Sequence, residues 1–185
     1  MVSGHRHTRQ RSTSEFLRAA GIIYNSQFLS GASYSMAKSQ QRIPTPALVL
    51  GLAGLLPFFI SAYLSFNADV TSSATGLLSL GAYGAVILSF LGGIRWGLVL
   101  NNKAQVQKWA PLMWSVVPSL IAWPALLLPS RYMLLVLVAG LLFQYAMDNE
   151  AIKVKKMPNW FGRLRLILTT GAVLSLIAGL LSTIV

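Results

Sequence analysis

The sequence predicts an all-α integral membrane protein, a bundle of five transmembrane helices. Of its 185 residues, 55% are hydrophobic and only 10% are charged, whereas about 25% of a soluble domain is charged. Five apolar stretches approach or exceed the roughly 20 residues that cross a bilayer. They lack the strict alternation of polar and apolar residues that a membrane β-strand requires. The expected spans are about 43–66, 77–100, 109–128, 132–147 and 164–185.

Residues 1–42 form a polar, basic leader, which we expect to be disordered and separate from a transmembrane domain at 43–185. A leader rich in arginine and serine and poor in acids is typical of a mitochondrial transit peptide. Alternatively, the true start is Met36, which would leave the short basic head of a bacterial inner-membrane protein. The lack of amphipathic periodicity before Met36 favours this second interpretation. His5 and His7 suggest no metal site, because the chain has no other histidine and no cysteine.

Prolines should shape two of the spans. Pro57 lies inside the first span and should kink it. The third span carries three prolines, and prolines that free backbone carbonyls inside a bundle are common in transporters. The second, fourth and fifth spans contain no proline.

Basic residues are divided unequally between the two ends of the predicted bundle. The chain has 15 Lys and Arg against 4 Asp and Glu, and of these cations only Arg131 falls on the side opposite the N-terminus. The positive-inside rule therefore predicts a cytoplasmic (or matrix) N-terminus and a C-terminus outside. We expect a bacterial inner (cell) membrane, with the mitochondrial inner membrane as the alternative. We do not expect a nucleic-acid partner, because in a membrane protein such an excess of cations sets topology.

Small residues follow one another at intervals of four along the second span. This spacing places side chains along one ridge of a helix, and small residues let a second backbone approach closely. The ridge predicts helix packing within the bundle, with a strip of small residues that faces a pore as the alternative, and a homo-oligomer is a further partner to consider. Its members are Gly81, Ala85, Ser89, Gly93 and Gly97.

Arg95 is the charged residue inside the core of the second span. Helical side chains lean towards their own N-terminus, which in this orientation leads Arg95 back into the membrane, so an internal partner is favoured. Asp148 lies at matching depth at the end of the fourth span, and Gln144 and Tyr145 share its helix face. We therefore predict a polar cluster of Arg95, Asp148, Gln144 and Tyr145, either as a structural salt bridge or as a substrate or proton site.

The segment 151–165 interleaves cations with Trp160 and Phe161. Cations beside a membrane are attracted to anionic lipids at about 1 kcal/mol each, and aromatic side chains settle at the level of the head groups. We expect this segment to contact anionic lipid head groups through Lys153, Lys155, Lys156, Arg163 and Arg165.

No catalytic arrangement is visible in the sequence. There is no histidine outside the leader, no cysteine, no nucleophile elbow and no phosphate-binding loop. We expect no enzyme activity and no cofactor. The first interpretation is a non-enzymatic membrane or assembly protein, and the alternative is a small-solute or proton-coupled transporter or channel that uses the polar cluster on the cytoplasmic side.

Three segments of the chain carry a resemblance to a known family. They are IPTPALVLGLAGLLPF at 43–58, YGAVILSFLGGIRWGL at 83–98, and Asp148 followed by MPNWFGRLRLILTTGAVLSL at 157–176. Together they resemble a family of small, uncharacterised multi-pass membrane proteins that includes transmembrane protein 69. The resemblance covers residues 43–185 and implies histidine or arginine at the position of Arg95, which suits a polar role. It implies no activity, substrate or catalytic residue.

Overall fold

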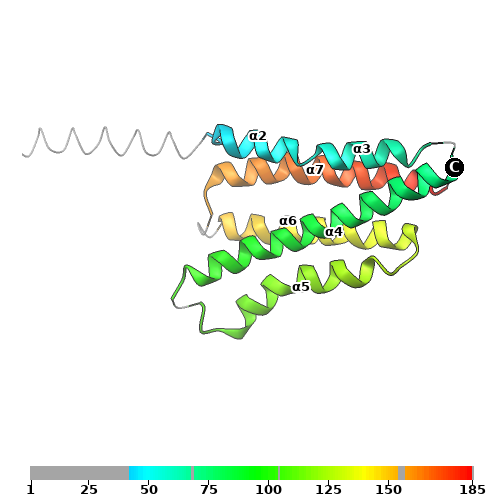
Figure 1. The fold of residues 1–185 in the computed structure, drawn as a ribbon. Coiled ribbons are helices and arrows are strands. Elements are labelled where there is room, and N and C mark those ends of the chain that lie inside the picture. Colours follow the sequence, from blue (N-terminus) through cyan, green and yellow to red (C-terminus); the bar gives the residue numbers. More distant parts are fainter. Residues whose placement is uncertain (1–41, 68, 104, 154–156, 185) are drawn as a thin grey trace, which may run out of the picture. The chain divides into compact units, whose positions relative to one another are not determined.

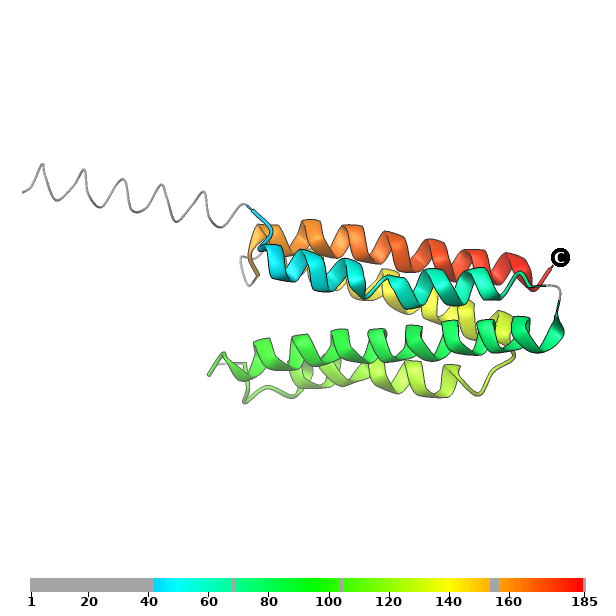
Figure 2. The same ribbon diagram turned by 45° about the horizontal axis from the view of Figure 1, so that its top comes forward.

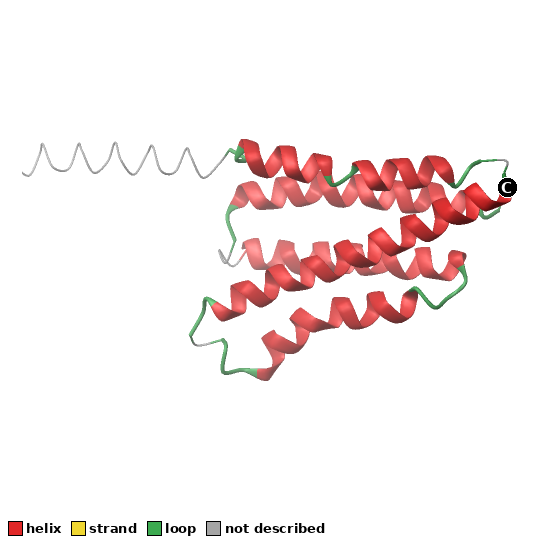
Figure 3. Cartoon of the chain, viewed as in Figure 1, coloured by secondary structure: helices red, strands yellow, loops and turns green. Residues whose placement is uncertain are grey.

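The computed structural model describes residues 42–67, 69–103, 105–153 and 157–184. The leader, with Met36, His5 and His7, lies outside the described residues. Residues 43–185 form a compact unit by themselves. The part of the chain that the structure describes contains helices and turns and no strand, which confirms the all-α prediction (Figure 3).

In the part of the chain that the structure describes, the bundle consists of five helical rods that alternate in direction, the first of them made of two consecutive helices (Figure 1). Four are long and apolar enough to cross a membrane, namely 45–64, 70–100, 130–152 and 159–182. The fifth, α5, has 17 residues. The rods are built from α2 (Thr45–Ala53), α3 (Leu56–Leu64), α4 (Val70–Leu100), α5 (Trp109–Ala125), α6 (Ser130–Lys153) and α7 (Asn159–Ser182).

The first rod is interrupted at Gly54 and Leu55, which separate α2 from α3. Pro57 explains the interruption, because it cannot donate a backbone hydrogen bond and its ring clashes with the preceding turn. The hydroxyl of Tyr83 on α4 donates to the carbonyl oxygen of Gly54 over 2.9 Å. Tyr83 also packs edge-on against Phe58, with ring centroids 4.9 Å apart. The predicted kink is thus a short break that α4 stabilises.

Helix α4 is the central element, since it packs against α3, α5, α6 and α7. Helix α4 has 31 residues, and at about 1.5 Å per residue its length exceeds the roughly 30 Å thickness of a bilayer core. A tilt of the helix would accommodate this excess length. Helix α5 lies along α4, on the side away from α2 and α7 (Figures 1 and 2). The core lies mainly between α3, α4, α6 and α7, and its most deeply buried large side chains include Phe58, Leu80, Leu88, Leu134, Leu137, Leu141 and Leu176.

Three spans are longer than the sequence predicts. Helix α4 begins at Val70 because the Asp69 carboxylate caps it, accepting from the backbone N–H and the hydroxyl of Ser72 at 2.8 Å each. Helix α6 continues to Lys153, and α7 begins at Asn159, directly after Pro158. Polar residues that we expected at helix ends or in loops therefore lie on regular helix.

One end of the bundle holds the start of α2, the ends of α4 and α6, and the starts of α5 and α7 (Figure 1). We call this the basic end, because Lys103, Lys108 and Arg163 belong to it. The opposite end holds Arg131 and Asp69. The candidate functional site lies at the basic end.

Candidate functional site

Three helices carry a buried stripe in which residues follow at alternating intervals of three and four. This spacing keeps side chains on one face of a helix, and in each stripe a charged residue occupies one of the positions. On α6 the stripe is Leu134, Leu137, Leu141, Gln144 and Asp148. On α7 it is Arg165, Thr169, Ala172, Leu176 and Gly179. On α4 it is Gly84, Leu88, Leu91 and then Arg95.

The three charged residues meet about one and a half helical turns inside the basic end. The Arg165 Nε–H donates to Asp148 Oδ2 over 2.9 Å. Arg95 Nη1 lies 3.7 Å from Asp148 Oδ1, and the Gln144 side-chain amide donates to the same oxygen over 3.1 Å. We call Arg95, Gln144, Asp148 and Arg165 the Asp148 cluster. One carboxylate is thus shared by two guanidinium groups.

The predicted ion pair between Arg95 and Asp148 is present, but it is the weaker of the two. The Arg165 side chain is only 6% exposed and makes a short, charge-assisted hydrogen bond, which is the strong kind, whereas Arg95 is 19% exposed and makes only the longer contact. Gln144 is buried beside Asp148 as predicted. Tyr145 is half-buried, and its place in the cluster stays a prediction.

Arg165 is the residue that sequence analysis misplaced. We expected it at the level of the lipid head groups, but it is buried and faces Asp148, so the prediction of a head-group contact is wrong for this residue. The reason is that α7 begins at Asn159, six residues before Arg165. The stripe it shares with Thr169 and Ala172 was the signal that could have identified it. Arg163 is exposed, Lys155 and Lys156 lie outside the described residues, and the Lys153 contact stays a prediction.

The small-residue ridge on α4 packs inside the bundle over only part of its length. Gly81 and Ala85 are buried, and a Cβ on Gly81 would overlap the end of Met133. Ser89 is half-buried, whereas Gly93 and Gly97 are exposed and a Cβ on either would meet nothing within 4 Å. For these two glycines the prediction of packing within the bundle is wrong.

Helix geometry explains this outcome. At 3.6 residues per turn, each step of four residues advances by about 40°, so four steps turn the ridge by about 160°, from the core to the outside. The close approach to α5 is made instead by Gly92, where a Cβ would overlap the Ser115 carbonyl oxygen.

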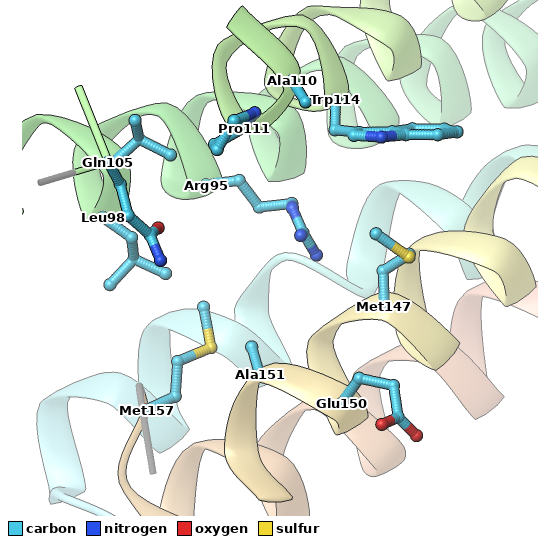
Figure 4. A pocket seen from close by; sticks show the side chains of 11 residues that line it. Arg95, Leu98, Gln105, Ala110, Pro111, Trp114, Met147, Glu150, Ala151 and Met157 are labelled. Carbon is cyan, nitrogen blue, oxygen red and sulfur yellow. The ribbon is translucent and has the colours of Figure 1, made fainter. Parts of the chain in front are cut away.

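The Asp148 cluster borders a pocket of about 330 Å³ at the basic end. Figure 4 shows the Arg95 guanidinium extending from α4 towards the space between α4 and α6, and the Glu150 carboxylate directed away from it. We call this the Arg95 pocket. It is lined by Arg95, Leu98, Val99, Gln105, Ala110, Pro111, Trp114, Met147, Glu150, Ala151 and Met157.

Among the described residues, three buried side-chain polar atoms have no hydrogen-bond partner: Arg95 Nη1, Arg165 Nη2 and Thr169 Oγ1. Two of them belong to the arginines that share Asp148. Buried polar groups are normally satisfied, and the exceptions often mark a place for a ligand or ion. Within the same described residues, no group of three or more His, Cys, Asp or Glu could hold a metal ion. The chemistry the cluster offers is hydrogen-bond donation and positive charge.

Comparison with known proteins places this bundle in a family. The family described as "Protein of unknown function (DUF3429)" matches residues 43–181. The chain belongs to this family. A relative named Transmembrane protein 69 from Xenopus tropicalis is 39% identical over 151 residues, covering 79% of this chain and 58% of that protein. Transmembrane protein 69 from Mus musculus is 37% identical over 143 residues, covering 75% and 56%.

The chain therefore spans a little over half the length of these relatives. No solved structure matches it. The predicted resemblance is confirmed, and with the apolar helices it establishes an integral membrane protein of a family whose description assigns no function. All four charged or amide members of the Asp148 cluster lie inside the matched residues.

Proposed function

We propose that this chain is a non-enzymatic membrane protein that binds a small anionic solute in the Arg95 pocket, as part of a transport function. The observation that carries the proposal is the sharing of Asp148 by Arg95 and Arg165. Two cations face one anion there, and the less tightly held cation lines an open pocket. An anion beside Arg95 would balance the charge.

Electrostatics supports Arg95 as the binding group. A buried charge is costly unless it is paired and hydrogen-bonded, and a charged side chain inside a membrane commonly marks a pathway or a ligand site. Arg165 has a partner at 2.9 Å, whereas Arg95 Nη1 has no hydrogen bond and lies 3.7 Å from the shared carboxylate. A guanidinium group in this state is suited to a carboxylate or phosphate oxygen.

We further propose that the Arg95 pocket lies on the cytoplasmic (or matrix) side. The positive-inside rule supports this orientation, since Lys103, Lys108 and Arg163 belong to the same end of the bundle. The membrane would be the bacterial inner membrane or, alternatively, the mitochondrial inner membrane. Because the chain has no cysteine, single-cysteine variants at Lys103 and Asn67 can be tested directly with an impermeant thiol reagent. Labelling of Asn67→Cys alone from the cytoplasmic side would contradict the orientation.

Iodide titration tests the binding of an anion. Iodide is an anion that quenches tryptophan fluorescence, and Trp114 lines the Arg95 pocket. We expect saturable quenching in the purified protein that disappears in Trp114→Phe. Arg95→Gln should weaken it by about tenfold or more, since a hydrogen bond to a charged group contributes about 1.5–3 kcal/mol. Competition by inorganic phosphate or by small carboxylates then identifies the class of solute.

The matched control is Arg131→Gln, which removes the same charge from an exposed position at the opposite end. Acrylamide, a neutral quencher, should act equally on the wild type and on Arg95→Gln. If Arg131→Gln weakens iodide quenching as much as Arg95→Gln, overall charge explains the effect and the proposed site is wrong. Flux of the competing anion into proteoliposomes would then separate a transporter from a protein that only binds.

An assembly role is the second candidate, and one observation favours it. Gly93 and Gly97 are exposed on α4 with open space beside them, and small residues of this kind allow close contact between membrane helices. A second copy of the chain is the partner to test first. Cross-linking in native membranes should detect a homo-oligomer that is lost in a Gly93→Leu, Gly97→Leu variant. A monomer in both cases would argue against this role.

A further inference from the structure

A second pocket, of about 160 Å³, adjoins the Asp148 cluster at Arg165. It is formed by residues of α2, the α2–α3 break, α3, α4, α6 and α7, and we call it the Thr169 pocket. Its lining is apolar except for two side chains, Arg165 and Thr169, which stand one turn apart on α7. Apolar lining residues include Leu55, Phe58, Leu91 and Ala172.

The two polar side chains of this pocket both have a buried atom without a partner, Arg165 Nη2 and Thr169 Oγ1. Both residues are 5% exposed. The hydroxyl of Thr169 is unusual in this bundle. Hydroxyls inside membrane helices commonly bond to a carbonyl of the preceding turn, as Ser115 does with Pro111 and Ser175 with Gly171. Thr169 makes no such bond, although it occupies an ordinary helical position.

Both unpartnered groups can donate a hydrogen bond, so a ligand in this pocket must supply an acceptor. The charges already present at the site then limit the chemical class of this ligand. Arg165 is already neutralised by Asp148 at 2.9 Å, and burying a further charge among apolar side chains is costly. A neutral acceptor oxygen costs less, because the two donors compensate for its loss of water. A neutral carbonyl oxygen on an apolar body meets both conditions.

The pocket is open towards the part of the surface that faces lipid. Leu50 of α2 and Phe90 of α4 both line it, and they are 73% and 62% exposed. In a membrane, large apolar side chains exposed at this depth contact acyl chains. A ligand could therefore enter sideways from the bilayer, with its carbonyl at Arg165 and Thr169 and the rest of its body extending between Leu50 and Phe90.

We propose that the Thr169 pocket binds a membrane-dissolved molecule through one neutral carbonyl oxygen, which accepts hydrogen bonds from Arg165 Nη2 and Thr169 Oγ1. The ligand class is an apolar ester or ketone, such as the acyl ester of a glycerolipid or a lipid-soluble quinone. This site uses neither Arg95 nor the Arg95 pocket. It therefore stands or fails independently of the anion site.

Photolabelling of the full chain in nanodiscs tests the proposal. The probe is a long-chain fatty acid methyl ester with a diazirine on its chain, compared with the free acid and with a hydrocarbon of the same length that has no carbonyl. We expect the ester to label residues 50–58 and 87–91 at a lower concentration than either comparison probe. Thr169→Val, which keeps the shape and removes the hydroxyl, should weaken labelling roughly three- to tenfold, the value of one neutral hydrogen bond.

Two variants control for indirect effects. Thr170→Val makes the same change at the neighbouring exposed position and should leave labelling unchanged, and Thr169→Ser should retain it because the hydroxyl stays. Equal labelling by the hydrocarbon, an unchanged result in Thr169→Val, or tighter binding of the free acid would each overturn the proposal. Competition by diacylglycerol or by an alkyl quinone then shows which source of carbonyl the site prefers.

Discussion

Arg165 donates from Nε to Asp148 Oδ2 over 2.9 Å, and this bond joins the start of α7 to the end of α6 deep inside the basic end. Since Asp148 also lies 3.7 Å from Arg95 on α4, one carboxylate connects three helices. Losing one partner of a buried ion pair leaves an uncompensated charge, which costs about 3–5 kcal/mol. Removing Arg165 should therefore affect the stability of the protein differently from removing Arg95.

We expect Arg165→Gln to destabilise the protein clearly more than Arg95→Gln. The first variant removes the hydrogen-bonded partner of Asp148, whereas the second removes a more distant and partly exposed charge. Thermal unfolding in detergent, followed by loss of the folded peak in size-exclusion chromatography, measures the difference. A larger loss in Arg95→Gln would show that the longer ion pair is the structural one.

Exchanging charges within the Asp148 cluster tests whether both arginines share the carboxylate. We expect a single charge change at Arg95 or Asp148 to lower expression of the protein. Exchanging these two residues alone would place an arginine at position 148 against Arg165, so we expect the exchange not to restore that expression. Inverting all three charges, with Arg95→Asp, Asp148→Arg and Arg165→Asp, should restore part of it. Recovery by the two-residue exchange alone would mean that Arg165 does not share the carboxylate.

Gly92 and Gly93, which are neighbours on α4, should differ in how much a change to alanine affects stability. A Cβ at Gly92 would overlap the Ser115 carbonyl oxygen, and overpacking of this kind costs about 1–3 kcal/mol. Gly93→Ala meets open space and should change stability by less than about 1 kcal/mol. Unfolding measurements on the two single variants give the comparison, and an equal loss in both would contradict the assigned faces of α4.

Tyr83→Phe should weaken the attachment of the first rod to α4. The substitution removes the hydroxyl that donates to Gly54 but keeps the ring that packs against Phe58. The expected cost is about 0.5–1.5 kcal/mol, with faster hydrogen exchange in α2 and α3 than in α6. Unchanged exchange in α2 and α3 would mean that the break does not depend on this bond.

The cap of α4 predicts a dependence on acidic pH at the end opposite the cluster. Hydrogen bonds from the Ser72 side chain and backbone hold the pKa of Asp69 below its ordinary value of 3.8. The folded state therefore favours the charged form, so the cap contributes stability that is complete above about pH 3.8 and is lost as the pH falls through the lowered pKa. Asp69→Asn, which keeps a capping oxygen, should flatten the acidic limb of stability against pH, and an unchanged limb would exclude Asp69 as its cause.

Much of the fold could be predicted because apolar length and charge asymmetry are local signals. The five rods, the break near Pro57 and the partnership of Arg95 with Asp148 are all present in the structure. The starts of the helices were harder to predict, because Asn159 and Val70 begin helices inside segments that look polar. Because of that error Arg165 was expected at the first turn of its helix, at the level of the lipid head groups, and the second arginine of the cluster was missed. Hydropathy alone does not identify a charged residue that is buried in a helix stripe. The spacing of the residues from Arg165 through Thr169 to Gly179 does, because it places Arg165 on the same face as the buried residues.

The drift of the glycine ridge has a similar origin. Intervals of four do not match 3.6 residues per turn, so the pattern that begins at Gly81 in the core ends at Gly97 outside. Residues at alternating intervals of three and four stay on one face of a helix. This spacing would have identified Gly84, Leu88 and Arg95 as members of one stripe.

The break at Gly54 and Leu55 divides the first rod into two halves with different neighbours. Helix α3 packs against both α4 and α7, whereas α2 packs against α7. A change of angle at this break would therefore move α2 without disturbing the contacts of α3 with α4. Leu50, on α2, stands at the mouth of the Thr169 pocket. The first half of the rod thus forms one edge of the opening through which a ligand would pass between the Thr169 pocket and the lipid bilayer.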